Sequence, residues 1–242
     1  DPECPDRLHL QIEAMKLAFR DVHRHVGDPA AMRVSPEQLL DPAYLATRGA
    51  MIDPERATDF DHGDPRAGGT VLVTAAGRDG TMISLIQSNY TGFGSGVVIP
   101  GTGIAMQNRG ACFTCEPGHP NAPGPGKRPF HTIIPGFITR GGEPVAAFGV
   151  MGGPMQPQGH AQVLMRMADH GQNPQAALDA PRWQVTRGLE VLLEPGFPPE
   201  TVQQLRDRGH QVVEVADRTV RFGGGQVIVR MPEGGYCGAS DL

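Results

Sequence analysis

The 242-residue chain is poor in the features that mark several specialised classes of protein. It has four cysteines, too few for the disulfide framework of a small secreted domain in a chain of this length. No apolar run approaches the ~20 residues that a membrane-spanning helix needs. Basic residues do not predominate, since 21 Lys and Arg stand against 26 Asp and Glu. The charge therefore favours neither nucleic acid nor an anionic membrane as a partner, and the chain is predicted to be a soluble globular protein.

The start of the chain lacks an initiating methionine and the basic-then-apolar pattern of a signal peptide. Its first residues are Asp1-Pro2-Glu3-Cys4-Pro5. We therefore expect that a segment was removed or that the chain begins within a longer protein. A cytoplasmic location is expected, with a periplasmic or secreted one as the alternative, because a signal region would precede these residues.

Glycine and proline are abundant, with 33 and 23 residues, close to a quarter of the chain. Their positions show no Gly-X-Y period, and 39% of all residues are hydrophobic, which excludes collagen and wholesale disorder. The excess therefore predicts a folded protein rich in loops and turns. The length suits one domain, or at most two.

Helices are predicted in the first fifty residues. A capped start at 35–38 and a further stretch at 42–51 have helical signals. Apolar side chains recur every three or four residues at Leu8, Ile12, Met15, Phe19 and Val22, as in an amphipathic helix. The polar, glycine-rich and aspartate-rich stretch 59–69 then predicts an exposed, mobile loop.

Strands are predicted from residue 70 onward. The β-branched segment 70–75, the turn 78–80 and the segment 82–87 form a predicted hairpin. A long loop is expected at 116–129. Further strands are expected at 97–99, 145–150, 211–215 and 227–230, and helices at 160–170, after 173–174 and at 199–208. This order favours the α+β class, a mostly antiparallel sheet with helices layered on it.

Several motifs fail on inspection. Gly92-Phe-Gly-Ser-Gly96 is not the G-x-S-x-G elbow of a serine hydrolase, and Gly124-Pro-Gly-Lys127 is not a phosphate-binding loop. His23-Arg-His25 favours a solvated pair over a metal site. Cys112-Phe-Thr-Cys115 has C-x-x-C spacing but no second pair and no thioredoxin-like context. Two ordinary loop thiols are the favoured interpretation, with a zinc or redox pair as the alternatives.

One junction suits a particular catalytic chemistry. Gly68-Gly69 leads directly into Thr70, which opens the first predicted strand. In N-terminal nucleophile hydrolases the chain cuts itself before a Thr, Ser or Cys, and the freed α-amine serves as the base for that residue's side chain. The amine can do this because its pKa, about 7.7–8.0, lies near working pH. Taken alone, however, Gly-Gly-Thr favours an ordinary strand start.

The motifs downstream change that interpretation. They are Arg78-Asp-Gly80, Gln87-Ser-Asn-Tyr-Thr-Gly-Phe-Gly-Ser-Gly96, Gly126-Lys-Arg-Pro129, Gly149-Val-Met-Gly-Gly153, Asp179-Ala-Pro-Arg-Trp183 and Gly238-Ala-Ser-Asp241. With Glu13–Phe19 and Gly27–Pro29 upstream, their order and spacing resemble the γ-glutamyltranspeptidase family over essentially the whole chain. The resemblance implies an α+β fold that is part of the αββα sandwich of the N-terminal nucleophile hydrolases.

The resemblance also implies how the chain is divided. Residues 1–69 would be the helical C-terminal tail of a large subunit, ending in a flexible loop before the cleavage site between Gly69 and Thr70. Residues 70–242 would be the small catalytic subunit. Most of the large subunit, including an Arg that binds the donor carboxylate, would then be absent. We therefore expect pairing with a missing large-subunit portion, or self-association.

Four residues match the family's catalytic positions. The resemblance makes Thr70 the nucleophile, and Ser88 falls where the family usually has a Thr hydroxyl that hydrogen-bonds the nucleophile. Gly152 and Gly153 match the pair whose backbone N–H groups form an oxyanion hole, a role that suits consecutive glycines. The expected substrate-binding residues are Asn89, Tyr90, Arg109, Cys112, His131 and Thr132.

The chain departs from the family at several of these positions. Val71 follows the nucleophile where a second Thr is typical. Arg109 and Cys112 replace a Gln and an Asp that hold the donor's α-ammonium, and losing a charge-assisted hydrogen bond there is worth roughly 1.5–3 kcal/mol. His131-Thr132 replaces a Ser-Ser pair that contacts the α-carboxylate. Ordinary γ-glutamyl binding should therefore be weakened.

The resemblance implies a γ-glutamyltransferase or hydrolase in which Thr70 attacks a γ-glutamyl, glutathione-like amide, and water or an amino acid resolves the acyl-enzyme. No cofactor, metal, nucleic acid or membrane is expected to take part. Two alternatives stay open. One is an amide hydrolase, or acylase, for a non-glutamyl acyl group, and the other is a catalytically inactive, truncated or unprocessed family member.

Overall fold

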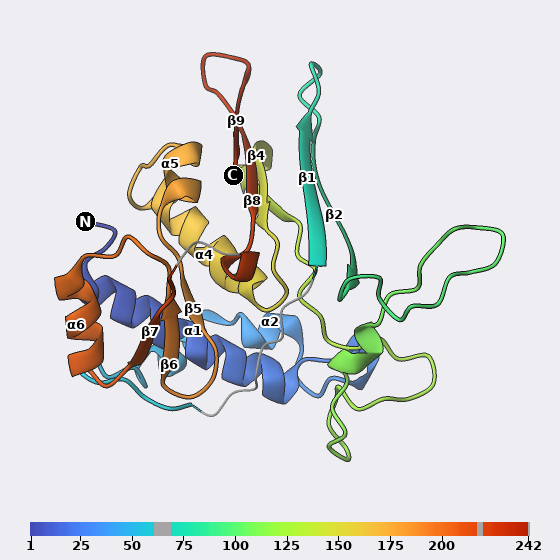
Figure 1. The fold of residues 1–242 in the computed structure, drawn as a ribbon, viewed down its shortest axis with the longest axis horizontal. Coiled ribbons are helices and arrows are strands. Elements are labelled where there is room, and N and C mark those ends of the chain that lie inside the picture. Colours follow the sequence, from blue (N-terminus) through green and yellow to red (C-terminus); the bar gives the residue numbers. More distant parts are fainter. Residues whose placement is uncertain (61–68, 217–219, 242) are drawn as a thin grey trace.

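The computed structural model describes residues 1–60, 69–216 and 220–241, so most of the predicted loop 59–69 lies outside the described residues. The helices are α1 (Pro5–His25), α2 (Pro36–Leu39), α3 (Pro42–Gly49), α4 (Met155–Ala168), α5 (Pro174–Asp179) and α6 (Pro199–Asp207), with 3₁₀ turns η1 (Pro29–Ala31), η2 (Arg109–Cys112) and η3 (Val220–Phe222). The strands are β1 (Gly69–Ala76), β2 (Met82–Tyr90), β3 (Gly136–Arg140), β4 (Glu143–Val150), β5 (Trp183–Val185), β6 (Glu190–Leu193), β7 (Gln211–Glu214), β8 (Gly225–Arg230) and β9 (Tyr236–Ser240). Figure 1 shows their arrangement.

The strands of the described residues form three sheets, with orders β1-β2, β3-β4-β8-β9 and β5-β6-β7. All pairings are antiparallel except that of β6 with β7. The predicted α+β class and the mostly antiparallel pairing are therefore confirmed. The strand expected at 97–99 is wrong, because this segment makes only an isolated bridge, Val98 to Ala105. Glycines with positive φ, at 94, 96, 101 and 103, turn the backbone repeatedly, which prevents a continuous ladder of strand hydrogen bonds in this segment.

The predicted helices form where capping residues or the spacing of apolar residues indicate a helix. On α1, Leu8 and Ile12 are buried as the spacing predicts. Ser35 begins α2 with a capping box, since its side chain accepts from the backbone of Gln38 and the Gln38 side chain accepts in return. The chain leaves α1 at Gly27, where a Cβ would lie 2.5 Å from the Pro120 carbonyl oxygen. This close approach brings the long loop of residues 91–135 against α1.

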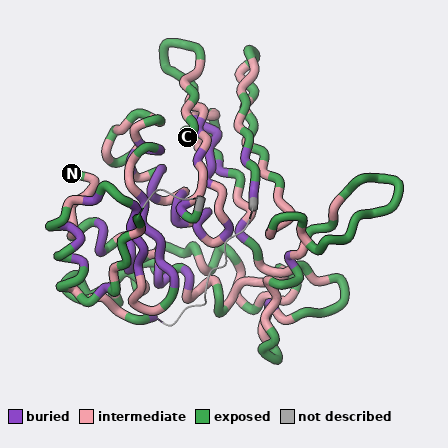
Figure 2. The backbone as a smooth tube through the Cα atoms, viewed as in Figure 1, coloured by how far each residue is buried: buried purple, intermediate pink, exposed green. Residues whose placement is uncertain are grey.

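The core has two main parts. One lies where α1 and α6 pack on the β5-β6-β7 sheet around the buried Trp183. The other lies where α4 and α5 cover β4 and β8, around Phe148 and Val150. Figure 2 shows buried residues concentrated in these layers, whereas the tips of the β1-β2 and β8-β9 hairpins are exposed. Within the described residues, no helix combines the length and the apolar character needed to cross a membrane.

The β1-β2 hairpin has one packed face and one exposed face. Its packed face turns Leu72 against β4. The opposite face carries four largely exposed aliphatic side chains, at Val71, Val73, Ile83 and Leu85. Register places Val73 opposite Leu85 on this face, so the apolar residues are contiguous. The site at the start of β1 is therefore supported from one side only within the described structure.

Candidate active site

Thr70 lies at a break in the pairing of β1 with β2. Gly69 pairs with Tyr90 and Val71 pairs with Gln87, so the register shifts across Thr70. Two residues of β2 thus oppose one residue of β1, which is a β-bulge. Bulges re-aim a side chain and are frequent beside active sites. The extra residue of the bulge is on β2, between Gln87 and Tyr90, while Thr70 keeps to the packed face that it shares with Leu72 and is buried, with 8% exposure.

The Thr70 hydroxyl is held by the neighbouring strand. Its Oγ1 donates to the Ser88 Oγ at 3.1 Å, and the Tyr90 backbone N–H donates to the same Ser88 oxygen at 2.9 Å. Tyr90 has φ of 77°, a left-handed conformation that is unfavourable for a bulky residue. The Tyr90 N–H fixes the Ser88 oxygen that receives the Thr70 hydroxyl. The structure therefore joins Thr70 and Ser88, the pair that the sequence predicted to interact.

The glycine pair, Gly152 and Gly153, lies between the end of β4 and the start of α4. Both residues have positive φ, 131° and 58°, which glycine adopts without penalty. Their carbonyls accept from Met155 and Gln156 at 3.1 and 3.0 Å. Because the Gly152 carbonyl is used in the first turn of α4, the Gly153 N–H of the same peptide unit points the opposite way, at the N-terminal end of the helix. Such a position favours negative charge.

The Thr70 end of β1 and the glycine pair lie at the same edge of the fold (Figure 1). Two contacts set the relative direction of β1-β2 and β4. The Ser84 hydroxyl donates to the Phe148 carbonyl at 3.0 Å, and a Cβ at Gly149 would lie 2.6 Å from a Leu72 methyl. The Thr70 end of β1 therefore lies on the same side as the end of β4 that leads to the glycine pair. A nucleophile and an oxyanion-binding turn at one edge could act on a carbonyl together.

A cavity of about 500 Å³ adjoins this edge. Tyr90, whose amide contacts Ser88, and Pro154, which follows the glycine pair, are in its wall. Five of the six predicted substrate-binding residues line it, namely Tyr90, Arg109, Cys112, His131 and Thr132. Asn89 is not among its lining residues, and its carbonyl instead accepts from the backbone N–H of Asn108 at 3.1 Å.

Arg109 is the charged group of this cavity. It lies on η2 with only 7% of its surface exposed, and its guanidinium carbon is 5.2 Å from the centre of the Tyr90 ring. Its Nε is buried and has no hydrogen-bond partner among the described residues. Burial lowers the pKa of Arg109, while the neighbouring Cys112 and Tyr90 raise it. The cavity thus contains a buried cation held by a cation–π contact.

His131 faces the same cation. The Ile133 backbone N–H donates to its Nδ1 at 3.2 Å, so neutral His131 carries its proton on Nε2. Desolvation, and then the positive charge of Arg109, lower the pKa of His131. At neutral pH, His131 is therefore a neutral hydrogen-bond donor beside a charged one.

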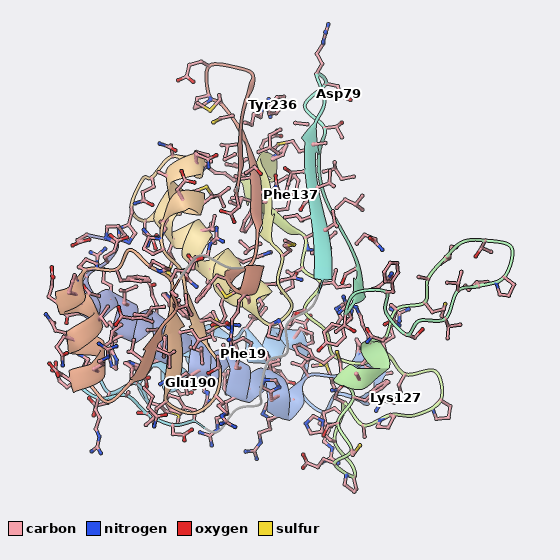
Figure 3. All side chains as sticks on the ribbon, viewed as in Figure 1. Phe19, Asp79, Lys127, Phe137, Glu190 and Tyr236 are labelled. Carbon is pink, nitrogen blue, oxygen red and sulfur yellow. The ribbon has the colours of Figure 1, made fainter. Side chains whose placement is uncertain are left out.

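The sequence missed the wall of the cavity that α1 supplies. Phe19, labelled in Figure 3, and His23 line it from this helix. Asn121 is buried and braces the loop side, because its side chain donates to the Cys112 carbonyl at 2.8 Å and accepts from the Phe130 backbone at 2.7 Å. No local signal marks these residues, since only the packing of the loop on α1 brings them together.

Among the described residues, His9, Glu13 and His210 have the spacing of metal ligands, with candidate atoms within 4.8 Å of one another. The Lys16 ammonium lies among them, 2.8 Å from a Glu13 oxygen and 3.4 Å from the His210 Nδ1. His9 Nε2 contacts the Asp53 carbonyl at 2.8 Å, so its Nδ1 accepts from His210 Nε2–H, also at 2.8 Å. The cluster is thus a closed hydrogen-bond chain in which an ammonium occupies the place of a metal.

Two neutral histidines predict a stability that falls in mild acid. Desolvation, and then Lys16, lower the pKa of His210 to about 3, and desolvation lowers that of His160 to about 4. Both values lie below the ordinary 6.5, so the unfolded chain takes up protons first as the pH falls. We expect a loss of about 1.5 kcal/mol per histidine between about pH 6.5 and 5. Urea unfolding at several pH values measures this loss. In His160→Gln the free energy of unfolding should fall with decreasing pH about half as steeply as in the wild type, and an equally steep fall would show that His160 is not one of the two groups.

Comparison with known proteins identifies the family. The model described as Gamma-glutamyltranspeptidase matches residues 1–242. The chain belongs to the γ-glutamyltranspeptidase family. The relatives and solved neighbours of this family are enzymes with the fold of N-terminal nucleophile hydrolases. The family and the fold class expected from the sequence are therefore confirmed.

Three relatives indicate the range of the family around this chain. The oxamate amidohydrolase proenzyme of Klebsiella pneumoniae is 37% identical, covering 100% of this chain and 46% of that protein. The glutathione hydrolase-like YwrD proenzyme of Bacillus subtilis is 36% identical, covering 96% and 45%. The crystal structure of cephalosporin acylase from Bacillus halodurans superposes with a TM-score of 0.91 at 53% identity, covering 100% and 44%. The chain therefore spans less than half the length of these relatives.

Proposed function

We propose that Thr70 is the nucleophile of an amide-cleaving enzyme and that the chain is cut between Gly69 and Thr70. Residues 1–69 are then the tail of a large subunit and residues 70–242 the small catalytic subunit. The observation that carries this proposal is the hydrogen bond from the Thr70 hydroxyl to Ser88 at a β-bulge, at the edge that also holds the glycine pair. Ordinary strand pairing does not require a buried hydroxyl–hydroxyl hydrogen bond at a bulge.

The reaction follows from these groups. The α-amine of Thr70 takes the proton of its own hydroxyl as Oγ1 attacks the amide carbonyl, and the amides of Gly152 and Gly153 bind the oxyanion. The carbon–nitrogen bond breaks, and the amine leaves with that proton. Water or an acceptor amine then attacks the resulting ester, the bond from carbon to Thr70 Oγ1 breaks, and the hydroxyl recovers its proton. Ser88 orients Oγ1 throughout.

Two donor classes are compatible with this chemistry. The first is a γ-glutamyl amide, the substrate class implied by the family name. The second is an amide with a non-glutamyl acyl group, as in the named activities of the oxamate amidohydrolase and the cephalosporin acylase. The placement of Arg109 favours the second class, because a buried guanidinium repels the α-ammonium of a glutamyl group.

The exposed aliphatic face of β1-β2 supports a larger assembly. Val71, Val73, Ile83 and Leu85 form a contiguous apolar surface, and such surfaces mark interaction sites. Because the relatives are more than twice as long as this chain, we propose that additional large-subunit residues cover this face, or that a second copy does so.

Intact mass spectrometry after incubation near pH 8 tests this function directly. Cleavage at the proposed bond would give two fragments, residues 1–69 and 70–242, in place of one species of 25.8 kDa. Addition of an activated acyl ester should then increase the mass of the 70–242 fragment alone by one acyl group. A single uncut species that takes up no acyl group would overturn the proposal.

A further inference from the structure

The guanidinium of Arg109 is a buried cation without an acidic partner among the described residues. Its side chain is more than nine-tenths buried, its Nε has no hydrogen-bond partner, and no described carboxylate forms a salt bridge with it. Burying a charge is costly unless it is paired. The Tyr90 ring at 5.2 Å offsets part of this cost, but it leaves the donors in the plane of the guanidinium free for an anion.

The remainder of the cavity wall is also suited to an anion. Of the described residues that line the cavity, Glu116 is the one carboxylate. It is exposed, and it also lines a second hollow whose other lining residues include Arg20, Arg24 and Arg33. His131 carries its neutral N–H on Nε2 and lies close enough to Arg109 to feel its charge. An ammonium entering this cavity would meet a cation and no dedicated carboxylate.

The cavity is connected to the proposed nucleophile through Tyr90. The backbone N–H of Tyr90 holds Ser88, which receives the Thr70 hydroxyl, while the ring of the same residue lies against Arg109. Thr70 itself is not among the residues that line the cavity, so an acyl group that reaches from Thr70 past Tyr90 into the cavity would meet the guanidinium. What Arg109 binds is then the far end of the acyl group, not the leaving amine.

We propose that Arg109 binds the free carboxylate of a dicarboxylic acid monoamide, and that the acyl group carries no α-ammonium. This inference rests on the proposed function of Thr70 and adds the chemical class of its substrate. Hydrolysis of such a monoamide consumes one water and releases the dicarboxylic acid and the amine or ammonia. His131 Nε2–H provides a second donor, which gives the carboxylate a charged and a neutral partner.

A matched set of small amides tests the proposal. Glutaramate has one carboxylate, glutaramide replaces that carboxylate by a neutral amide, and glutamine adds an α-ammonium to glutaramate. Oxamate and succinamate, each with its diamide, cover shorter acyl chains. By isothermal titration calorimetry, at least one monoamide should bind about tenfold or more tightly than its diamide, which is the worth of a charged hydrogen bond. Glutaramate should bind more tightly than glutamine.

Variants assign the effect to Arg109. In Arg109→Met the difference between monoamide and diamide should fall to within about twofold, while binding of the diamide stays within about twofold of the wild type. Arg140→Met, at an exposed arginine on β3, is the matched control and should keep the full difference. If every monoamide binds no tighter than its diamide, or if Arg109→Met binds as the wild type does, the proposal is overturned.

Ammonia release separates this proposal from the proposed function. If Thr70 is the nucleophile and Arg109 binds the carboxylate, then kcat/KM should be higher for the monoamide than for its diamide, and Arg109→Met should remove this preference. Equal turnover of monoamide and diamide would refute the carboxylate site and leave Thr70 catalysis standing. Tight monoamide binding without turnover or acyl-enzyme would refute Thr70 catalysis and leave the carboxylate site standing.

Discussion

Thr70→Ala is expected to abolish both self-cleavage and amide hydrolysis. The variant removes the oxygen that attacks the Gly69 carbonyl during processing and the substrate carbonyl during turnover. Removing a covalent nucleophile costs at least about 10³-fold in kcat. Because Thr70 is buried at a bulge with one hydroxyl hydrogen bond, we expect the fold to persist with a loss of about 1 kcal/mol. Intact mass and ammonia release measure the two activities, and urea unfolding measures the fold.

Thr70→Ser is the control for this variant. It keeps the hydroxyl and its hydrogen bond to Ser88 and removes only a methyl group, so cleavage at the same bond should continue at a reduced rate. Thr70→Val is the complementary variant, since it keeps the shape of the side chain without a nucleophilic oxygen. A Thr70→Ala or Thr70→Val protein that is still cut before residue 70, or that still releases ammonia, would remove Thr70 from the mechanism.

The first half of the site was predictable through the family resemblance, whose motifs here lie in short continuous segments of the sequence. Thr70 and Ser88 lie on the two strands of one hairpin, and a hairpin is the most local of sheet structures. Gly152 and Gly153 lie at a strand-to-helix turn, and consecutive glycines indicate such a turn. The structure joins Thr70 to Ser88, as the resemblance implied, and gives both glycines positive φ, as a tight turn requires.

The cavity was less predictable because its walls come from distant parts of the chain. Phe19 and His23 on α1 meet Arg109 and His131 across the long loop, and nothing local in the sequence indicates that contact. Comparison of motifs could place Arg109 near the substrate. Only the structure provides its burial and its unpartnered Nε, which leave its charge without a described carboxylate to neutralise it.

The missed strands have a similar physical cause. In β5 all three residues are buried, and in β6 three of four are, so neither strand shows the alternation of buried and exposed residues that identifies a half-exposed strand. β9 has the sequence Tyr-Cys-Gly-Ala-Ser, which is weak in strand-forming residues. It is held by pairing with β8, a tertiary contact. By contrast, caps and apolar spacing indicated the helices, and the start of α4 at Met155 differs from the expected 160 because Gln-Pro-Gln lacks an apolar stripe.

Gly223 packs directly against the glycine pair, since a Cβ at Gly152 would lie 3.0 Å from the Gly223 Cα. It has φ of 82°, and a Cβ there would lie 2.1 Å from the Met151 carbonyl oxygen. The neighbouring Gly224 carbonyl accepts from the Met151 N–H at 2.9 Å, and Arg182 holds the Gly223 carbonyl at 3.4 Å. The backbone immediately before Gly152 is thus fixed by contact with a glycine that has no room for a side chain.

Gly223→Ala is therefore expected to impair catalysis as well as stability. The added methyl must displace the Met151 carbonyl, and with it the amide of Gly152, and a misplacement of about 1 Å in a catalytic group costs about 10²-fold in rate. Left-handed strain and overpacking together should lower the free energy of unfolding by about 2–5 kcal/mol. Gly235→Ala is the matched control, since Gly235 has φ of 81° but open space around its Cβ, and it should lose only the ~1–2 kcal/mol of strain with unchanged kcat. Urea unfolding and ammonia release, measured where both variants are folded, distinguish the two effects. Equal kcat in Gly223→Ala and Gly235→Ala would mean that the turn at Gly152 does not hold the oxyanion.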